Sequence, residues 1–187
     1  MLKITSLKIH LAVASLLLVW GSSVLAYSFS PTNNAPKHDF FHNFSGSLLT
    51  ELKQVKKDNK FGVMVFFSTS HCRFCRRMKA TVFNQASVQK YFRSHFQLIE
   101  LDIESDQQLT DVSGTTPSYI EYAKRNRVRL TPTITFLDHH GEHVHRHVGM
   151  IADPQEFIWL GEYVTSGQTR NQSFSTFKMN KRRRIAQ

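Results

Sequence analysis

The feature that most constrains the fold is a pair of cysteines two residues apart, placed just after an apolar run. The run, residues 61–67, reads FGVMVFF; it lacks helical periodicity and is rich in β-formers, which predicts a strand buried on both faces. Cys72 and Cys75 follow and are the only cysteines of the chain. Met78 and Val82 continue from Cys75 at helical spacing. The pattern therefore predicts a buried strand that delivers Cys72 to the N-terminus of a helix.

Two thiols in this arrangement are suited to thiol–disulfide exchange. The unpaired N–H groups of a first helical turn stabilise a thiolate, which is the species that attacks a disulfide. Positive charge is also concentrated here, on His71, Arg73, Arg76, Arg77 and Lys79. We expect Cys72 to be the reactive thiol. Cys75, one turn deeper, should be shielded and should attack the mixed disulfide formed at Cys72.

Two other interpretations of the cysteine pair stay open. A structural disulfide across one helical turn closes so short a loop that it restricts the unfolded chain very little. A zinc site would need two further ligands, which His71, His95 or later histidines would have to supply, and the chain has no second C-x-x-C motif. Exchange chemistry is the interpretation that we favour.

Five of the ten histidines gather in one short segment, at positions 139, 140, 143, 145 and 147. Alternation predicts that the last three share one face of a strand, a spacing that can bind copper or zinc. An edge strand with polar side chains turned outward is the simpler interpretation, because no carboxylate or cysteine completes a clear coordination set. We therefore expect no bound metal and no other cofactor.

The N-terminal residues have the pattern of a secretory signal peptide. Lys3 and Lys8 precede an apolar core at residues 11–20 and small residues that end at Ala26. The core is shorter than the roughly 20 residues that span a membrane, which favours cleavage after Ala26 over a retained anchor. We expect residues 1–26 to be a signal peptide and the mature protein to be periplasmic, where a cysteine pair can meet disulfides of exported proteins.

The rest of the chain predicts one domain between two flanking segments. Residues 27–46 contain two prolines and little periodicity, which indicates a lead-in segment whose aromatic residues can dock on the domain. Residues 47–167 form the predicted domain, and residues 168–187 a basic tail. We expect its residues 181–184 to be disordered and solvated, and contact with an anionic membrane surface or an acidic partner is the alternative. The formal net charge of +10 comes mostly from the signal segment and the tail. The charge therefore gives no nucleic-acid-binding face, and we expect a monomer without nucleic acid.

Apolar patterns predict the order α-β-α-β-α-β-β-α for this domain. A helix after Ser47 precedes the first strand, and a second strand occupies residues 96–103. The third strand, residues 130–137, is interrupted early by Thr-Pro-Thr, a tolerated place for a proline. A turn at residues 138–142 leads to a returning strand and a last helix.

This arrangement resembles the thioredoxin fold over roughly residues 48–166. Shorter motifs resemble the SoxW-like exported thioredoxins associated with sulfur-oxidation clusters: CRFCRRMK from Cys72, LTDVSG at residues 109–114, VRLTPT from Val128, and Val148-Gly149. The resemblance implies an α/β fold, a three-layer sandwich whose central mixed sheet of about four strands is flanked by helices. It also implies thiol–disulfide oxidoreductase activity, although a redox-inactive thioredoxin-like binding module is the alternative.

The resemblance also implies roles for individual residues. Cys72 matches the nucleophilic cysteine of the family, Cys75 the resolving cysteine and Pro132 the cis-proline. Thr131 then lies beside the reactive cysteine, where its backbone pairs with the substrate as a short strand.

The chain departs from thioredoxin at the position of a buried aspartate that takes the proton of the resolving thiol. Phe66 stands there. Glu100, on the neighbouring strand where thioredoxins carry a lysine, is our candidate for the missing base. Its alternative is a solvated charge at the end of a strand.

The resemblance implies a reducing role, in which a membrane thiol reductant supplies electrons that pass to cysteine-containing exported proteins. The local charges favour the Cys72 thiolate and so predict a reduction potential above that of thioredoxin. We therefore expect a moderately oxidising pair that a partner keeps reduced.

Overall fold

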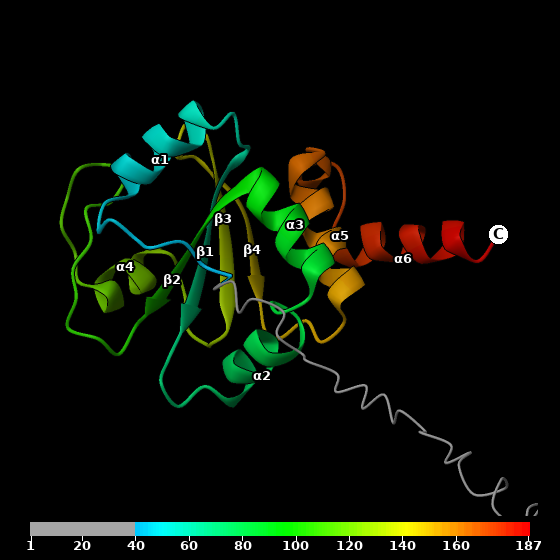
Figure 1. Cartoon of the computed structure of the whole chain (residues 1–187), viewed down its shortest axis with the longest axis horizontal. Coiled ribbons are helices and arrows are strands. Elements are labelled where there is room, and N and C mark those ends of the chain that lie inside the picture. Colours follow the sequence, from blue (N-terminus) through cyan, green and yellow to red (C-terminus); the bar gives the residue numbers. More distant parts are fainter. Residues whose placement is uncertain (1–39) are drawn as a thin grey trace, which may run out of the picture. The chain divides into compact units, whose positions relative to one another are not determined.

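The computed structural model describes residues 40–187, so the predicted signal peptide and residues 27–39 of the lead-in segment lie outside the described residues. A four-stranded mixed sheet forms the centre, in the order β2-β1-β3-β4 (Figure 1). Its strands are β1 (Gly62–Ser68), β2 (Phe96–Asp102), β3 (Thr133–Asp138) and β4 (His143–Val148). β1 pairs parallel with β2 and antiparallel with β3, and β3 and β4 form a hairpin. The predicted mixed sheet is confirmed.

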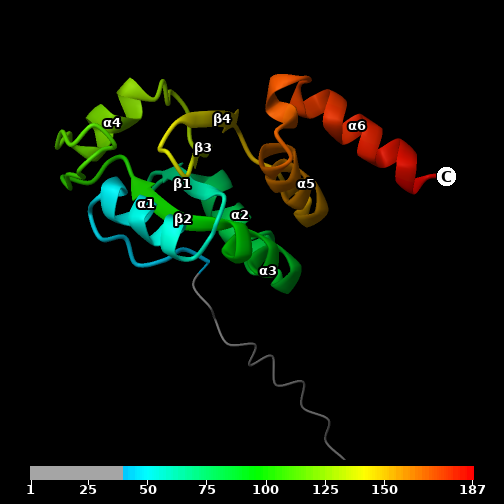
Figure 2. The same ribbon diagram turned by 90° about the horizontal axis from the view of Figure 1, so that it is seen from above.

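Helices cover both faces of this sheet. They are α1 (Leu48–Lys57), α2 (Arg73–Thr81), α3 (Ala86–His95), α4 (Tyr119–Arg125), α5 (Pro154–Thr165) and α6 (Phe174–Ile185), with a 3-10 turn, η1 (Gln168–Arg170). α1 and α4 lie on one face, and α3 and α5 on the other, as both views show (Figures 1 and 2). The fold is therefore the predicted α/β three-layer sandwich. Every helix in the described part of the chain is too short or too polar to span a bilayer.

β1 is buried along its whole length because both of its faces are covered. Met64 and Phe66 pack into the core beneath α2, α3 and α5. Val63, Val65 and Phe67 point the other way, into the core beneath α1 and α4. Alternate side chains of one strand thus serve two cores, which explains why its sequence is apolar at nearly every position.

The end of the lead-in segment belongs to the core. Phe40 is only 4% exposed, and its ring stacks on Phe83 with centroids 4.4 Å apart. Phe41 lies edge-on to the same ring at 5.5 Å. His42 joins the edge of β2, because its N–H donates to the Leu98 carbonyl and its Nδ1 accepts from the Leu98 N–H, both at 2.9 Å. The predicted docking of these aromatic residues is confirmed.

The expectation that residues 181–184 are disordered is wrong, because the segment after residue 167 forms η1 and α6, and α6 includes these residues. Ser173 caps α6 by accepting a hydrogen bond from the Thr176 N–H at 3.2 Å. The rings of Phe174 and Phe177 lie 5.6 and 5.4 Å from the ring of Tyr163 on α5. The segment therefore has an apolar face that packs against α5. Its highly charged sequence did not indicate this face.

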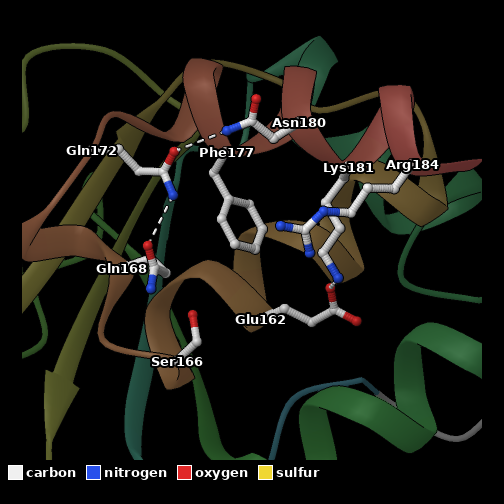
Figure 3. Close-up of a pocket in the computed structure, with 8 residues that line it drawn as sticks. All are labelled: Glu162, Ser166, Gln168, Gln172, Phe177, Asn180, Lys181 and Arg184. Atoms are coloured by element: carbon white, nitrogen blue, oxygen red, sulfur yellow. Dashed lines mark hydrogen bonds and ion pairs between the residues drawn. The ribbon is translucent and has the colours of Figure 1, made fainter.

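Carboxylates of α5 neutralise part of the positive charge of α6. Lys178 and Arg182 both pair with Glu156, the first at 3.0 Å, and Lys181 lies 2.6 Å from Glu162. A cavity of about 310 Å³ remains between α5, η1 and α6. Figure 3 shows the Phe177 ring in this cavity, with the amides of Gln168, Gln172 and Asn180 on one side and the Lys181–Glu162 pair on the other.

A bulge in β4 divides the predicted histidine set. His143 is opposite Leu137 and His145 opposite Phe136, so one extra residue, Val144, is inserted. Leu137 and Phe136 face different cores, so His143 lies on the α4 side of the sheet and His145 on the α5 side. The prediction that three histidines share one face is therefore wrong.

His145 and His147 are also not turned outward to solvent. The His145 ring lies 5.2 Å from Tyr163 of α5, and the His147 ring lies 5.9 Å from Phe174 of α6. Burial, followed by the charge of Lys178, lowers the pKa of His147. β4 is an edge strand as expected, but α5 and α6 cover one of its faces.

Candidate functional site

Cys72 and Cys75 form a disulfide at the N-terminus of α2, with Cα atoms 5.2 Å apart. Cys72 is the N-cap residue, and its Sγ accepts a hydrogen bond from the Cys75 N–H at 3.0 Å. Cys72 is 8% exposed and Cys75 only 1%. Both sequence predictions are confirmed: the strand delivers Cys72 to a helix N-terminus, and Cys75 is the shielded sulfur. An incoming thiol can therefore reach Cys72 first.

The positive charges around the cysteines are less uniform than the sequence predicted. Arg73 and Arg77 are exposed, and the Arg73 guanidinium lies 5.8 Å from the centre of the Phe74 ring. Arg76 donates a hydrogen bond through Nη1 to the Ser70 carbonyl at 3.0 Å. These arginines leave the first two turns of α2 with a basic outer surface.

His71 does not act with these arginines as a free positive charge. Its Nδ1 lies 3.5 Å from the Glu104 carboxylate, which also accepts from the Ser70 hydroxyl at 3.0 Å. The Ser70 hydrogen bond, and then the one from His71, hold the pKa of Glu104 below its usual range. The segment after β2 thus brings an unpredicted carboxylate beside the cysteine loop, because the Ile103 N–H bonds to the Ser68 carbonyl at 3.0 Å.

The Thr131–Pro132 peptide bond is cis and directly precedes β3. The Pro132 carbonyl accepts from the Gly149 N–H at 2.9 Å, which ties this turn to the end of β4. Thr133 pairs with Phe67, near the end of β1 that leads to Cys72. Thr131 and Pro132 therefore lie at the same end of the sheet as the cysteine pair.

Glu100 faces α2, on the side of the sheet that holds the cysteines. It is opposite Phe66 in the parallel β1–β2 pair. It lies two residues after Leu98, so the two side chains share one face of β2, and Leu98 belongs to the same core as Cys75. Its carboxylate accepts from the Ser68 hydroxyl at 2.6 Å and pairs with Lys79 of α2. Within residues 40–187, its bonds go to these two groups and not to either sulfur.

Sequence reasoning missed Ser68 and the pairing of Lys79. Ser68 is 3% exposed, although serine at the end of a strand gave no signal of burial. Lys79 is four residues after Cys75, so helical spacing places it on the same side of α2, and this signal was present. Its partner on β2 depends on tertiary packing.

The described part of the chain contains no group of three or more His, Cys, Asp or Glu side chains placed to hold a metal ion. The histidines of β4 do not form such a group because the bulge turns His143 away from His145 and His147. No observation on the described residues therefore favours the zinc or copper interpretation.

In a comparison with protein families, the model of a thioredoxin-like domain matches residues 48–165. No curated protein matches the chain significantly. The matched range contains both cysteines, Glu100 and the Thr131–Pro132 bond. Phe40 and α6 lie outside it.

Solved structures share the fold. A thioredoxin-fold protein from Helicobacter pylori is 19% identical, with a TM-score of 0.60 over 78% of this chain and 89% of that one. A Bacteroides thetaiotaomicron protein proposed to be a disulphide-isomerase is 26% identical, with a TM-score of 0.53 over 71% and 94%. An oxidoreductase named DsbH is 17% identical, with a TM-score of 0.51 over 64% and 82%. These likenesses support a thioredoxin-like fold for the chain.

Proposed function

The chain belongs to the thioredoxin-like domain family, and from that premise we propose that it is an exported reductase of protein disulfides. Thiol–disulfide oxidoreductase activity follows from the family and from the Cys72–Cys75 pair. The observation that carries the proposal is the unequal exposure of the two cysteine residues at the start of α2, 8% for Cys72 against 1% for Cys75. Such a pair can separate attack on a client from release of that client.

The reaction consists of two exchanges that conserve electrons. The Cys72 thiolate attacks one sulfur of a client disulfide, which forms a mixed disulfide and releases one client thiolate. The Cys75 sulfur then attacks Cys72 Sγ, which closes the internal disulfide and releases the second client thiolate. The client gains two electrons and the protein loses two. A dithiol reductant, which we expect to be a membrane protein, must return them.

The backbone around the cysteines supports these roles. Cys72 Sγ accepts the Cys75 N–H at 3.0 Å, and Cys72 is the N-cap of α2, where the helix dipole stabilises negative charge. The exposed Arg73 and Arg77 add to this field, whereas Glu104 opposes it by pairing with His71. We therefore still expect a reduction potential above the value of about −270 mV given for thioredoxin, by a smaller margin than the sequence alone predicted.

Glu100 is our candidate to take the proton of Cys75. Its position on the side of the sheet that holds the cysteines supports this role. Thr131 and Pro132 are proposed to hold the client backbone beside Cys72, since they share one end of the sheet with it. The narrower resemblance to SoxW-like exported thioredoxins, and the periplasmic location, stay predictions.

The central experiment is trapping of clients by single-cysteine variants. Cys75→Ser should accumulate mixed disulfides, because the attacking thiolate survives while the thiol that releases the client is gone. Cys72→Ser is the matched control and should trap little. Equal trapping by the two variants would contradict the roles, and insulin reduction no faster than that by a double-serine variant would contradict the activity itself.

The direction of electron flow needs its own measurement. Equilibration with glutathione gives the potential of the pair, and thiol labelling in growing cells gives its redox state. A reductase should be largely in the dithiol form in cells. A pair found wholly as the disulfide would make the protein an oxidant of its clients and would refute the reducing role.

A further inference from the structure

A basic groove lies outside the thiol site, between the end of α4 and β4. It has a volume of about 540 Å³ and is lined by seven residues, of which only Val144 is apolar. Three are arginines: Arg125 and Arg127 from the end of α4 and Arg146 from β4. None of the lining residues is a carboxylate. The groove therefore presents concentrated positive charge on a surface that the exchange reaction does not use.

Much of this positive charge is not neutralised by an acidic side chain among the described residues. Arg146 donates through Nη1 to the Asn126 carbonyl at 3.1 Å, and a guanidinium has further donors. Arg125 contacts Asp111 at 3.3 Å and Thr115 at 3.0 Å. Arg127 is exposed and makes no side-chain hydrogen bond or ion pair among the described residues. Two of the three guanidinium groups thus face the groove without a counter-charge.

The backbone of Arg127 is unusual for its residue type. It has φ of 55°, the left-handed conformation that directly follows α4, a position where glycine is strongly preferred. A long side chain there carries a conformational cost that glycine avoids. The other non-glycine residue with positive φ in the described chain is Asn59, a residue type that tolerates this region well. Arg127 is therefore held where its backbone is unfavourable and its charge is unpaired.

Two histidines, His143 and His145, line the groove beside the arginines. Burial, followed by the charge of Arg146, lowers the pKa of His143. Burial, His147, His143 and Arg146 together lower the pKa of His145 to about 4. Both rings are therefore neutral near pH 7 and add no positive charge to the groove.

We propose that this groove binds an extended acidic segment of another protein, whose carboxylates pair with the guanidinium groups of Arg127 and Arg146. Arginine suits this partner because its planar fork binds a carboxylate with two parallel hydrogen bonds. The volume is many times the roughly 30 Å³ of one water, so a single small oxyanion would leave most of it hydrated. The polar lining also differs from the mostly apolar pockets that hold small molecules.

Two other occupants fit less well. A second copy of this chain is disfavoured, because the sequence has 24 basic against 14 acidic residues. A single-stranded nucleic acid would need aromatic side chains on which bases stack, and the seven lining residues include no Phe, Tyr or Trp. The acidic peptide is the occupant that the charge and the lining favour.

The test is fluorescence anisotropy with the purified full chain and a labelled peptide of alternating glutamate and serine. The same peptide with glutamine in place of glutamate is the ligand control. We expect the glutamate peptide to bind, the glutamine peptide to bind at least roughly tenfold more weakly, and binding to weaken between about 50 and 200 mM salt, since the screening length shortens.

Variants of the protein then locate the site. Arg127→Gly should raise the melting temperature, because glycine accepts the left-handed backbone, and should still weaken peptide binding by roughly tenfold. Asn59→Gly, at the other left-handed position, and Lys57→Gln, which removes one exposed charge from α1, should each change the affinity less than about twofold. Arg146→Gln should weaken binding, and Arg146→Lys should restore it only in part.

Each contrary result overturns the proposal. Equal binding of the glutamine peptide would remove the role of the carboxylates. An equal loss in Lys57→Gln would mean general attraction to a basic protein. Displacement of the peptide by phosphate or citrate at matched concentration would make this a small-anion site, and tighter binding of an oligonucleotide would make it a nucleic-acid site. Insulin reduction by Arg127→Gly should equal that of the unmodified protein, which separates this test from that of the proposed function.

Discussion

Two segments outside the matched domain are attached to it by different forces. Phe40, before the domain, is 4% exposed and stacks on Phe83 in the core. α6, after the domain, has no fully buried residue and is held by half-buried rings and by ion pairs with Glu156 and Glu162. Apolar burial is insensitive to salt and stabilises strongly, whereas partly exposed ion pairs contribute little and are screened. The first segment should therefore unfold with the domain, and the second should detach more easily.

The largest expected effect is at Phe40. Phe40→Ala should lower the free energy of unfolding by about 3–5 kcal/mol, because it removes a ring from a packed aromatic cluster. Urea unfolding followed by tryptophan fluorescence measures this loss. Phe74→Ala is the matched control, since that ring is 49% exposed, and it should cost less than about 1 kcal/mol. A similar loss in both variants would show that Phe40 is not part of the core.

Phe177 should matter less. Phe177→Ala should cost about 1–2 kcal/mol of local stability, since its ring is half-buried against Tyr163. We expect α6 to open locally, so trypsin should cleave at its basic residues before it cleaves the domain. Met179→Ala, at a side chain 47% exposed on the same helix, should leave the cleavage rate unchanged. Simultaneous loss of α6 and of the domain would mean that the two unfold as one unit.

Acid should weaken the packing of β4 against α5, where the His145 ring lies 5.2 Å from the Tyr163 ring. The folded state lowers the pKa of His145 from 6.5 to about 4, chiefly through burial and then through His147, His143 and Arg146. The unfolded chain then binds the proton more readily, so stability falls as the pH drops below about 6.5 and levels off below about 4. Unfolding measured across this range should show a shallower fall in His145→Gln. His140→Gln, at an exposed ring, should retain the full slope.

The smallest effect should follow the loss of one carboxylate. Glu156→Gln removes the partner of both Lys178 and Arg182, yet we expect less than about 1 kcal/mol, because such pairs are partly solvated. Hydrogen exchange of α6 at low salt should speed up in this variant, and the difference should shrink as salt is added. Glu142→Gln, at an exposed position that has no ion pair among residues 40–187, should have no effect on α6. A loss that persists at high salt would assign the attachment to packing.

Local sequence was sufficient for the elements that hold the cysteines. The run before Cys72 predicted a strand buried on both faces, and β1 is such a strand, because every one of its alternating positions meets a core. Helical spacing from Cys75 through Met78 predicted α2 and its buried side. The thiol pair followed from these two patterns, since both depend on residues close together in the chain. The fold class rested on the order of all the elements and on its resemblance to the thioredoxin fold.

What the sequence by itself determined is therefore the strand, the helix, the hairpin and the positions of the two sulfurs, because period and turn chemistry encode them locally. Tertiary structure alone decided three further features: the bulge that separates His143 from His145, the pairing of His71 with Glu104, and the helix formed by the basic C-terminal segment. Each depends on a partner that is distant in sequence. A strand's register, a carboxylate across a loop and a carboxylate on α5 are set by packing, and no local spacing of residues specifies them.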